Sequence, residues 1–305
     1  MLLAITGNDI TQSLVIGIVN GAVYALIALG LVLVYRSSGI FNFAQAEFGT
    51  IAVYGAYYAF TYGLPFTGWT LGYVPSAIFG VVCGVGAALL TERLVIRPLS
   101  ASPKVTLLVA TAGVALLSIG TAFWRTGDNA LKFFDPLTQW SGVNVGNVQV
   151  SGQRILTLVL LAVAVALLSL FFRSPYGLAV LAASQDADAS ALVGLDVKRI
   201  SMMVWGIAGL LGATAGILLQ GGNSFTPGAI TTLALIPGFT AAVIGGLTSL
   251  PGAVAGGMTI GLLEAFGRLS TFDAIPGASA VSVFLVLLLV LLVRPEGLLG
   301  TRTAT

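Results

Sequence analysis

Runs of roughly 20 apolar residues, repeated along almost the whole chain, constrain the fold more than any other feature of the sequence. Such a run has the length that a helix needs to cross the hydrocarbon core of a bilayer. Barrel strands would instead show segments of about ten residues with alternating polarity. Hydrophobic residues make up 57% of the 305 and charged residues only 8%, whereas a soluble domain averages about 25% charged residues. The sequence therefore predicts an all-α integral membrane protein.

The apolar runs predict a polytopic helical bundle of about eight or nine transmembrane segments, which occupies residues 1–305 as a single domain. The expected segments lie near residues 10–35, 40–60, 71–90, 105–124, 155–172, 200–219, 230–247, 253–266 and 278–293. Segment 40–60 begins with polar residues, and the pair 230–247 and 253–266 is dense in Gly, so both places are candidates for re-entrant or discontinuous helices. Close packing through small residues is the alternative for the Gly-rich pair.

The Lys and Arg residues indicate the orientation of the chain. When nine crossings are threaded, one side receives nine of the 13 basic residues: Arg36, Arg93, Arg97, Lys104, Arg173, Lys198, Arg199, Arg294 and Arg302. The other side receives Arg125, Lys132, Arg154 and Arg268. The positive-inside rule places the first side in the cytoplasm. We therefore expect the amino terminus outside, the carboxyl terminus in the cytoplasm, and an extracytoplasmic excursion at residues 125–153.

The longest polar interruption of the apolar pattern lies at residues 173–199, on the expected cytoplasmic side. It carries three basic and three acidic residues: Arg173, Lys198, Arg199, Asp186, Asp188 and Asp196. Pro175-Tyr176-Gly177 predicts a turn, and the Ala-rich run after it predicts a single amphipathic helix that Gly194 ends. Asp196 stands where an N-cap belongs for the next span.

The expected apolar face of this helix consists of Leu178, Leu181, Ala182, Ala189, Leu192 and Val193. An amphipathic helix between two spans is either a solvated linker or a docking surface for another protein. The residue pattern alone favours neither interpretation.

Ionisable and amide side chains within the apolar runs are candidates for function, because polar groups at membrane depth are costly. Glu47 lies near the start of segment 40–60, with Asn42 and Gln45 just before it. These side chains either face a substrate path at a broken helix or bond only to neighbouring helices. Pro237, in the Gly-rich pair, is a further candidate for lining the path. Glu264 has Arg268 four residues later, which favours a structural ion pair over a substrate role.

Several classes of function are excluded by residues that the chain lacks. It contains no histidine, which removes Ser-His catalysis and His-ligated zinc or haem, and no phosphate-binding loop of the form GxxxxGK[ST]. We therefore expect no enzymatic activity and no cofactor in this chain. Cys83 is the single cysteine, so no internal disulfide can form. The net charge of +2 argues against nucleic-acid binding. The amino-terminal MLLAITGNDI has no basic residue before its apolar stretch, so we expect no cleavable signal peptide.

Three stretches together resemble a known family. The run ALGLVLVYRSSGIFNFAQAEFGTIAVYGAY (residues 28–57) is similar to the first-span signature of permease subunits of ABC importers for branched-chain amino acids, in the branch with an INFAHGE-like motif. Here the motif reads FNFAQAE (residues 41–47), with Gln45 in place of His and Ala46 in place of Gly. Residues 177–199 resemble the cytoplasmic coupling segment of that family, and RPEGL (residues 294–298) resembles its ending.

The resemblance implies a prokaryotic inner-membrane importer and its partners. These are a second, homologous permease, two ATP-hydrolysing subunits and an extracytoplasmic solute-binding protein, with the lipid bilayer around the permeases. It also implies that the interruption 173–199 docks on the ATP-hydrolysing subunits. The residues expected in this contact are Gly177, Gln185, Asp186, Asp188, Gly194 and Asp196. Family members often carry arginines where this chain has Ala179 and Leu181.

Leucine, isoleucine and valine are the leading substrate class that the resemblance implies, with urea or short amides as the alternative within the same family. A transporter or channel driven by an ion gradient is an alternative of another class, because it would account for Glu47 and the Gly-rich pair. The mixed-charge cytoplasmic segment argues against it. An intramembrane enzyme is poorly supported, because no histidine is present and no two aspartates share a position at membrane depth.

Overall fold

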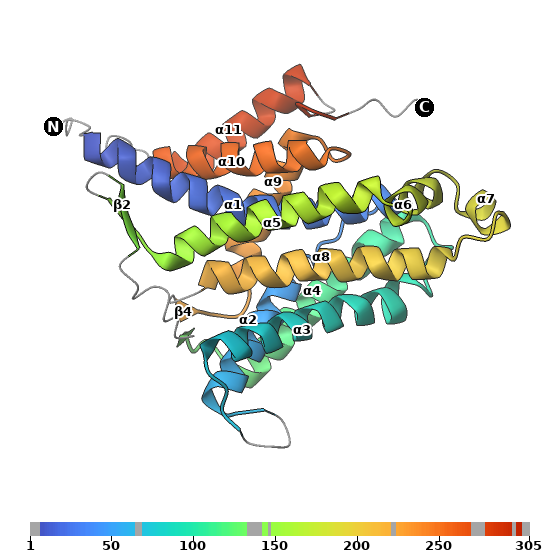
Figure 1. The fold of residues 1–305 in the computed structure, drawn as a ribbon, viewed down its shortest axis with the longest axis horizontal. Helices are drawn as coiled ribbons and strands as arrows, with labels where there is room; N and C mark the ends of the chain where they lie inside the picture. The colour runs from blue at the N-terminus through green and yellow to red at the C-terminus, as the bar shows by residue number, and fades with distance from the viewer. Residues whose placement is uncertain are drawn as a thin grey trace.

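The computed structural model describes residues 7–64, 69–132, 142–145, 148–220, 224–269, 278–294 and 297–300. Its helices lie along one common axis and form a bundle (Figure 1). They are α1 (Gly7–Ser38), α2 (Glu47–Thr61), α3 (Tyr73–Thr91) with the π-helix η1 (Glu92–Ile96), α4 (Lys104–Thr126), α5 (Gly152–Arg173), α6 (Pro175–Gln185), α7 (Ala187–Leu192), α8 (Val197–Gln220), the π-helix η3 (Thr231–Leu235), α9 (Ile236–Gly245), α10 (Leu250–Phe266) and α11 (Ala278–Val293). Parts of the predicted excursion 125–153 and of the ending 294–298 fall outside the described residues.

Helix lengths confirm a polytopic membrane protein. Among the described residues, five helices are long and apolar enough to cross a bilayer: Asp9–Ser38, Tyr73–Ile96, Lys104–Thr126, Gly152–Arg173 and Val197–Gln220. Three shorter apolar helices, Thr231–Gly245, Leu250–Phe266 and Val281–Val293, stand at the last three predicted segments. The segment predicted at 40–60 is the exception, because α2 begins only at Glu47. Its 15 residues cover about 22 Å, less than the roughly 30 Å of the hydrocarbon core.

Small residues pack α1 closely against α10. Gly17, Gly21 and Ala25 on α1 face Gly257 and Gly261 on α10, so that a Cβ added at Gly257 would lie 2.7 Å from the Cα of Ala25. One at Gly261 would lie 2.4 Å from the Cα of Gly21. Such small-residue seams let helix backbones approach within a membrane. At these positions the packing interpretation of the glycines is confirmed.

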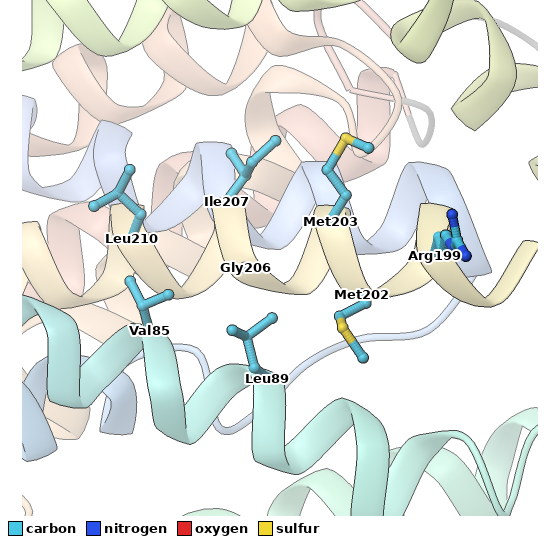
Figure 2. Close-up of a pocket in the computed structure, with 8 residues that line it drawn as sticks. All are labelled: Val85, Leu89, Arg199, Met202, Met203, Gly206, Ile207 and Leu210. Carbon is cyan, nitrogen blue, oxygen red and sulfur yellow. The ribbon is translucent and has the colours of Figure 1, made fainter.

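Helices α3 and α8 lie side by side on another face of the bundle. Helix α2 packs against both of them, where Gly49 approaches Gly212 and Gly216 of α8 and Gly80 of α3 approaches the backbone of α2. On the outer side, α3 and α8 leave an open groove of about 570 Å³. Figure 2 shows its side chains along both helices, with Arg199 at one end.

Two short antiparallel ribbons stand at one end of the bundle. Strand β1 (Leu131–Lys132) pairs with β4 (Ser224–Phe225), and β2 (Val143–Val145) pairs with β3 (Val148–Val150). The excursion therefore contains strands, and the all-α prediction is wrong in this detail. A single two-stranded ribbon is at best marginally stable in water, so these pairs depend on the bundle, as where the Phe225 ring contacts Tyr54 of α2 at 5.2 Å.

Candidate functional site

The first candidate site is the break that precedes α2. Helix α1 ends at Ser38, and Gly39 turns the chain with a positive φ of 67°. Residues 40–46 then return into the bundle without helical structure. A Cβ on Gly30 would lie only 2.1 Å from Nε2 of Gln45, and Gly30 stands eight residues before the end of α1, about 12 Å along the axis. Helix α2 therefore begins deep in the bundle, and a side chain at position 30 would displace the amide of Gln45.

Two amide side chains hold the break in place. Gln45 donates from Nε2 to the carbonyl oxygen of Ala208 in α8 at 2.8 Å, and Asn42 donates from Nδ2 to Oε1 of Gln45 at 3.3 Å. The Asn42 Oδ1 atom accepts from the backbone N–H of Ala44 at 3.1 Å. Both side chains are fully buried. The bond of Asn42 satisfies a backbone N–H of this stretch, as buried backbone requires inside a membrane, and the bond of Gln45 ties the stretch to α8.

Thr111 of α4 supports the break from the other side, and the sequence analysis did not identify it. Its Oγ1 accepts from the N–H of Phe43 at 3.2 Å and lies 3.3 Å from the carbonyl oxygen of Phe41. Thr111 stands in an apolar span with no polar pattern around it, so the sequence carried no signal for this role. The tertiary fold alone brings α4 to the break.

Glu47 is the first residue of α2 and is 1% exposed. Its Oε1 accepts a hydrogen bond from the hydroxyl of Thr231, at the start of η3. The hydroxyls of Thr50 and Ser118 also lie near this carboxyl, although neither they nor its Oε2 make a well-aligned hydrogen bond to a residue that the structure describes. A buried polar group without a partner costs about 1–3 kcal/mol, so a group of polar atoms around one carboxyl requires a physical explanation such as a bound water or solute.

Pro237 belongs to the second interrupted helix, which meets the first one here. It lies in the first turn of α9, directly after the π-helical turn η3. The Phe239 ring contacts Phe41 at 5.5 Å and Phe43 at 6.4 Å. The structure thus places Asn42 and Gln45 in one hydrogen-bonded pair, with Glu47 two residues later at the start of α2. The interrupted helix of Pro237 contacts this stretch through Phe239 and, by way of η3, through Thr231.

Glu264 stands apart from this stretch. Arg268 donates from Nη2 to its Oε1, and the Tyr24 hydroxyl donates to its Oε2. The ion pair predicted from the i, i+4 spacing is confirmed, and it joins α10 to α1.

The second candidate site is the segment between α5 and α8, which projects past the end of the bundle (Figure 1). It forms two helices, α6 and α7, where the sequence predicted a turn followed by one helix. Pro175 occupies the first turn of α6, where a proline is well tolerated, and Ser174 caps that turn by accepting from the N–H of Gly177 at 3.4 Å. Gly177 packs so closely on the end of α5 that a Cβ would lie 2.3 Å from the carbonyl oxygen of Phe171.

Asp186 causes the break between α6 and α7. Its backbone is extended (φ −151°), and its Oδ1 accepts from the N–H of Ala189 at 2.9 Å, so that it caps α7. Gly194 ends α7 with a φ of 90°, a conformation that side chains other than glycine rarely adopt. Asp196 caps α8 by accepting from the N–H of Arg199 at 3.1 Å. The predicted roles of Gly194 and Asp196 are confirmed, whereas the single long helix is wrong because the sequence analysis did not recognise Asp186 as a cap.

The apolar face predicted for this segment is largely exposed. The side of α6 that packs on the bundle carries Gly177 and Val180 instead. Leu178 is 61% exposed, Leu192 89% and Val193 79%. Gln185 and Asp188 are also exposed. Exposed apolar patches are typical of surfaces that contact another protein or a membrane.

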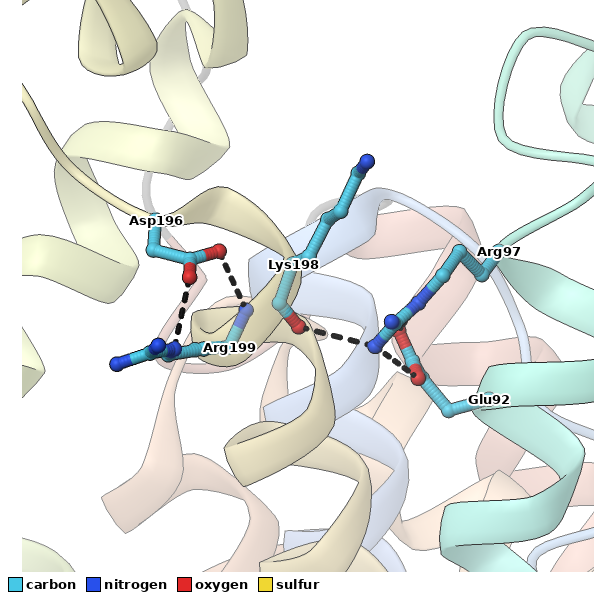
Figure 3. A network of polar contacts seen from close by, with 5 residues as sticks. All are labelled: Glu92, Arg97, Asp196, Lys198 and Arg199. Carbon is cyan, nitrogen blue, oxygen red and sulfur yellow. Dashed lines mark hydrogen bonds and ion pairs between the residues drawn. The ribbon is translucent and has the colours of Figure 1, made fainter.

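An ion-pair network connects the return arm of this segment to α3 (Figure 3). Glu92 in η1 is buried, and its Oε2 lies 2.9 Å from Nη2 of Arg97. The same Nη2 approaches the carbonyl oxygen of Lys198 in α8 at 3.4 Å. No pattern in the sequence predicted this network. It restrains the start of α8 relative to α3.

The chain is similar to known permease components over nearly its full length. A family model described as "Branched-chain amino acid transport system / permease component" matches residues 13–293. The chain is 33% identical to the high-affinity branched-chain amino acid transport system permease protein BraD of Pseudomonas aeruginosa and 30% identical to the corresponding protein LivH of Escherichia coli K12. Each alignment covers 95% of both chains.

The solved structure of PsaBC from Streptococcus pneumoniae in complex with Fab aligns over 95% of this chain and 91% of that one at 18% identity, and its TM-score of 0.42 is too low to support an argument. On the family model and the two relatives together, the chain belongs to the family of branched-chain amino acid transport system permease components.

Proposed function

We propose that this chain is a permease subunit of an ABC importer and forms part of the pathway by which branched-chain amino acids cross the membrane. Family membership supports a transport subunit rather than an enzyme. The observation that supports the proposal is the exposed segment of α6 and α7, whose apolar side chains Leu178, Leu192 and Val193 are not covered by the bundle. The named relatives belong to high-affinity branched-chain amino acid systems, which supports leucine, isoleucine and valine as the substrate class.

The proposed topology has nine crossings in the inner membrane of a prokaryote, with the amino terminus outside. Successive apolar helices alternate in direction in Figure 1, and the end that carries α6 and α7 also carries the end of α3 and the start of α4. This is the end with the excess of basic residues, so the positive-inside rule assigns it to the cytoplasm. Helix α2, η3 with α9, α10 and α11 are the short or interrupted crossings.

Coupling to ATP hydrolysis follows from the way in which α6 and α7 are held. ATP-hydrolysing subunits that seat this segment would pull on two long helices at once, α5 through Gly177 and α8 through Asp196. The network of Glu92 and Arg97 passes movement of the α8 start on to α3. When the two ATP-hydrolysing subunits close on ATP, they bind one of two arrangements of the bundle more tightly, and the permease shifts toward that arrangement.

The pathway in this proposal runs beside the break, between this chain and a second, homologous permease. Asn42 and Gln45 fix the geometry of the break, because their polar groups already bond within the chain. Glu47 has an oxygen without a well-aligned hydrogen bond to a described residue, so it is the group best suited to contact a polar solute or its water. Pro237 interrupts the facing helix. A solute-binding protein outside the membrane supplies the substrate.

The test is ATPase activity of the transporter purified from its own operon and reconstituted with its binding protein. We expect stimulation by leucine, isoleucine or valine, and none by urea or acetamide. Stimulation by urea or acetamide alone would support the importer proposal but would assign a different substrate. If no ATP-hydrolysing subunit co-purifies and the chain alone moves solute along an ion gradient, the importer proposal is wrong.

A further inference from the structure

The open groove between α3 and α8 has no role in the proposed transport cycle. On α8 it is lined by Arg199, Met202, Met203, Gly206, Ile207 and Leu210, and on α3 by Val85 and Leu89 (Figure 2). Gly206 forms its floor: a Cβ there would lie 3.3 Å from Cδ2 of Leu89, so any larger side chain would enter the groove. Apart from Arg199 the lining is apolar, and Met side chains adapt readily to a flexible partner.

The length of the groove corresponds to one leaflet of a bilayer. Arg199 and Leu210 stand eleven residues apart on α8, about 16 Å along the axis. Half of the hydrocarbon core measures about 15 Å. The groove is therefore long enough to accommodate an acyl chain of one leaflet, with the cation of Arg199 at one end.

The charge at the mouth of the groove is positive. Arg97, Lys198 and Arg199 lie at this end of α3 and α8, with the carboxylates of Glu92 and Asp196 (Figure 3), and Arg93 follows Glu92 in η1. Glu92 bonds with Arg97, and Asp196 bonds through Oδ2 with Nε of Arg199 at 2.8 Å. The terminal Nη groups of Arg199 make no hydrogen bond to any residue that the structure describes, and its side chain is 87% exposed. Two positive charges remain uncompensated in this group.

We propose that the α3–α8 groove binds one anionic phospholipid of the cytoplasmic leaflet. Its acyl chain lies along Met203, Gly206 and Leu210, and its phosphate is bound by Arg199 and Lys198. Basic pockets between helices on the cytoplasmic side are suited to anionic headgroups. The assignment to the cytoplasmic leaflet depends on the orientation given under the proposed function. The groove and the positive charge at its mouth do not depend on it. Because Arg199 and Lys198 begin α8 and Arg97 bonds to the Lys198 carbonyl, the lipid would stabilise the return arm of the coupling segment against α3.

The test measures lipid binding directly. The transporter, with the subunits that co-purify, is placed in nanodiscs of mixed phosphatidylglycerol and phosphatidylcholine, and the lipids that it retains are counted by native mass spectrometry. We expect the wild type to retain phosphatidylglycerol preferentially. The preference should fall about fivefold for each cation removed in Lys198→Gln and Arg199→Gln. Gly206→Leu should displace the lipid by filling the groove.

Two matched variants serve as controls. Gly86→Leu adds the same side chain on α3 at a position with open space around it, and Arg154→Gln removes a cation at the other end of the bundle. Both should retain the wild-type preference. Equal retention of the two lipids by the wild type would overturn the proposal, as would unchanged preference in Arg199→Gln and Gly206→Leu. Efficient cross-linking of Met203→Cys, in a Cys83→Ser background, to the second permease would also overturn it, because a protein helix would then occupy the groove. None of these readouts depends on uptake, so they stand apart from the test of transport.

Discussion

The break before α2 and the segment of α6 and α7 interrupt the apolar pattern in opposite ways. The break places polar side chains in the interior, and Asn42 and Gln45 are fully buried there. The α6–α7 segment places apolar side chains outside, and Leu192 and Val193 are almost fully exposed. At the break, most polar groups find partners within the chain, so the chain itself completes that geometry. The second region is complete only when another protein covers it.

The largest effect on the break before α2 is expected from a substitution at Gly30. Replacement by Leu would drive Gln45 out of its place and leave the Ala208 carbonyl without that donor. We expect a loss of about 3 kcal/mol in the free energy of unfolding, from overpacking together with the lost buried hydrogen bond. Thermal unfolding in detergent measures it, with Gly86→Leu as the control in open space. A midpoint equal to that of the control would mean that the break does not depend on glycine at position 30.

Substitutions at Glu47 distinguish a packing role from a transport role in the same region. Glu47→Ala removes the acceptor of the Thr231 hydroxyl and should cost about 2 kcal/mol of stability. Glu47→Gln keeps an acceptor and should unfold near the wild-type temperature. If the free oxygen serves the solute, uptake by the Gln variant should nevertheless fall at least about tenfold, equivalent to about 1.4 kcal/mol. Normal uptake by Glu47→Gln would assign Glu47 to packing alone.

The exposed segment predicts the opposite behaviour. Leu192→Ser combined with Val193→Ser removes apolar surface that touches no core, so the unfolding temperature of the isolated chain should not change. Binding of the ATP-hydrolysing subunits should weaken about tenfold, since it would lose roughly 1.4 kcal/mol of apolar contact. Co-purification yield and solute-stimulated ATPase activity measure this effect. If solute still stimulates ATP hydrolysis fully in the double variant, Leu192 and Val193 do not take part in the contact.

The smallest effect is expected at the Asp196 cap. Asp196→Ala removes the acceptor for the Arg199 N–H and should cost about 1 kcal/mol, whereas Asp196→Asn should retain most of the cap. Hydrogen exchange of the backbone amides in the first turn of α8 measures this local loss of stability. Equal protection in the two variants would show that the network of Glu92 and Arg97 alone holds the start of α8.

The sequence predicted the apolar helices, the polar residues of the break and the caps at Gly194 and Asp196, because these depend on local composition and spacing. It did not predict that Asp186 divides the coupling segment, since an Asp in an Ala-rich run resembles an ordinary helical residue until its backbone is extended. It also missed Thr111, Thr231 and Arg97. Each of them acts on a residue far away along the chain.

The amino-acid sequence by itself determined that this chain is a polytopic membrane protein and which family it resembles, because hydrophobic run length and short motifs are local properties. Only the tertiary structure decided that α2 begins inside the bundle, that Glu47 meets Thr231, and that the apolar side of α6 and α7 faces outward. These outcomes depend on which helices become neighbours, and that choice is made by the close packing of small residues and by the need of every buried polar group for a partner.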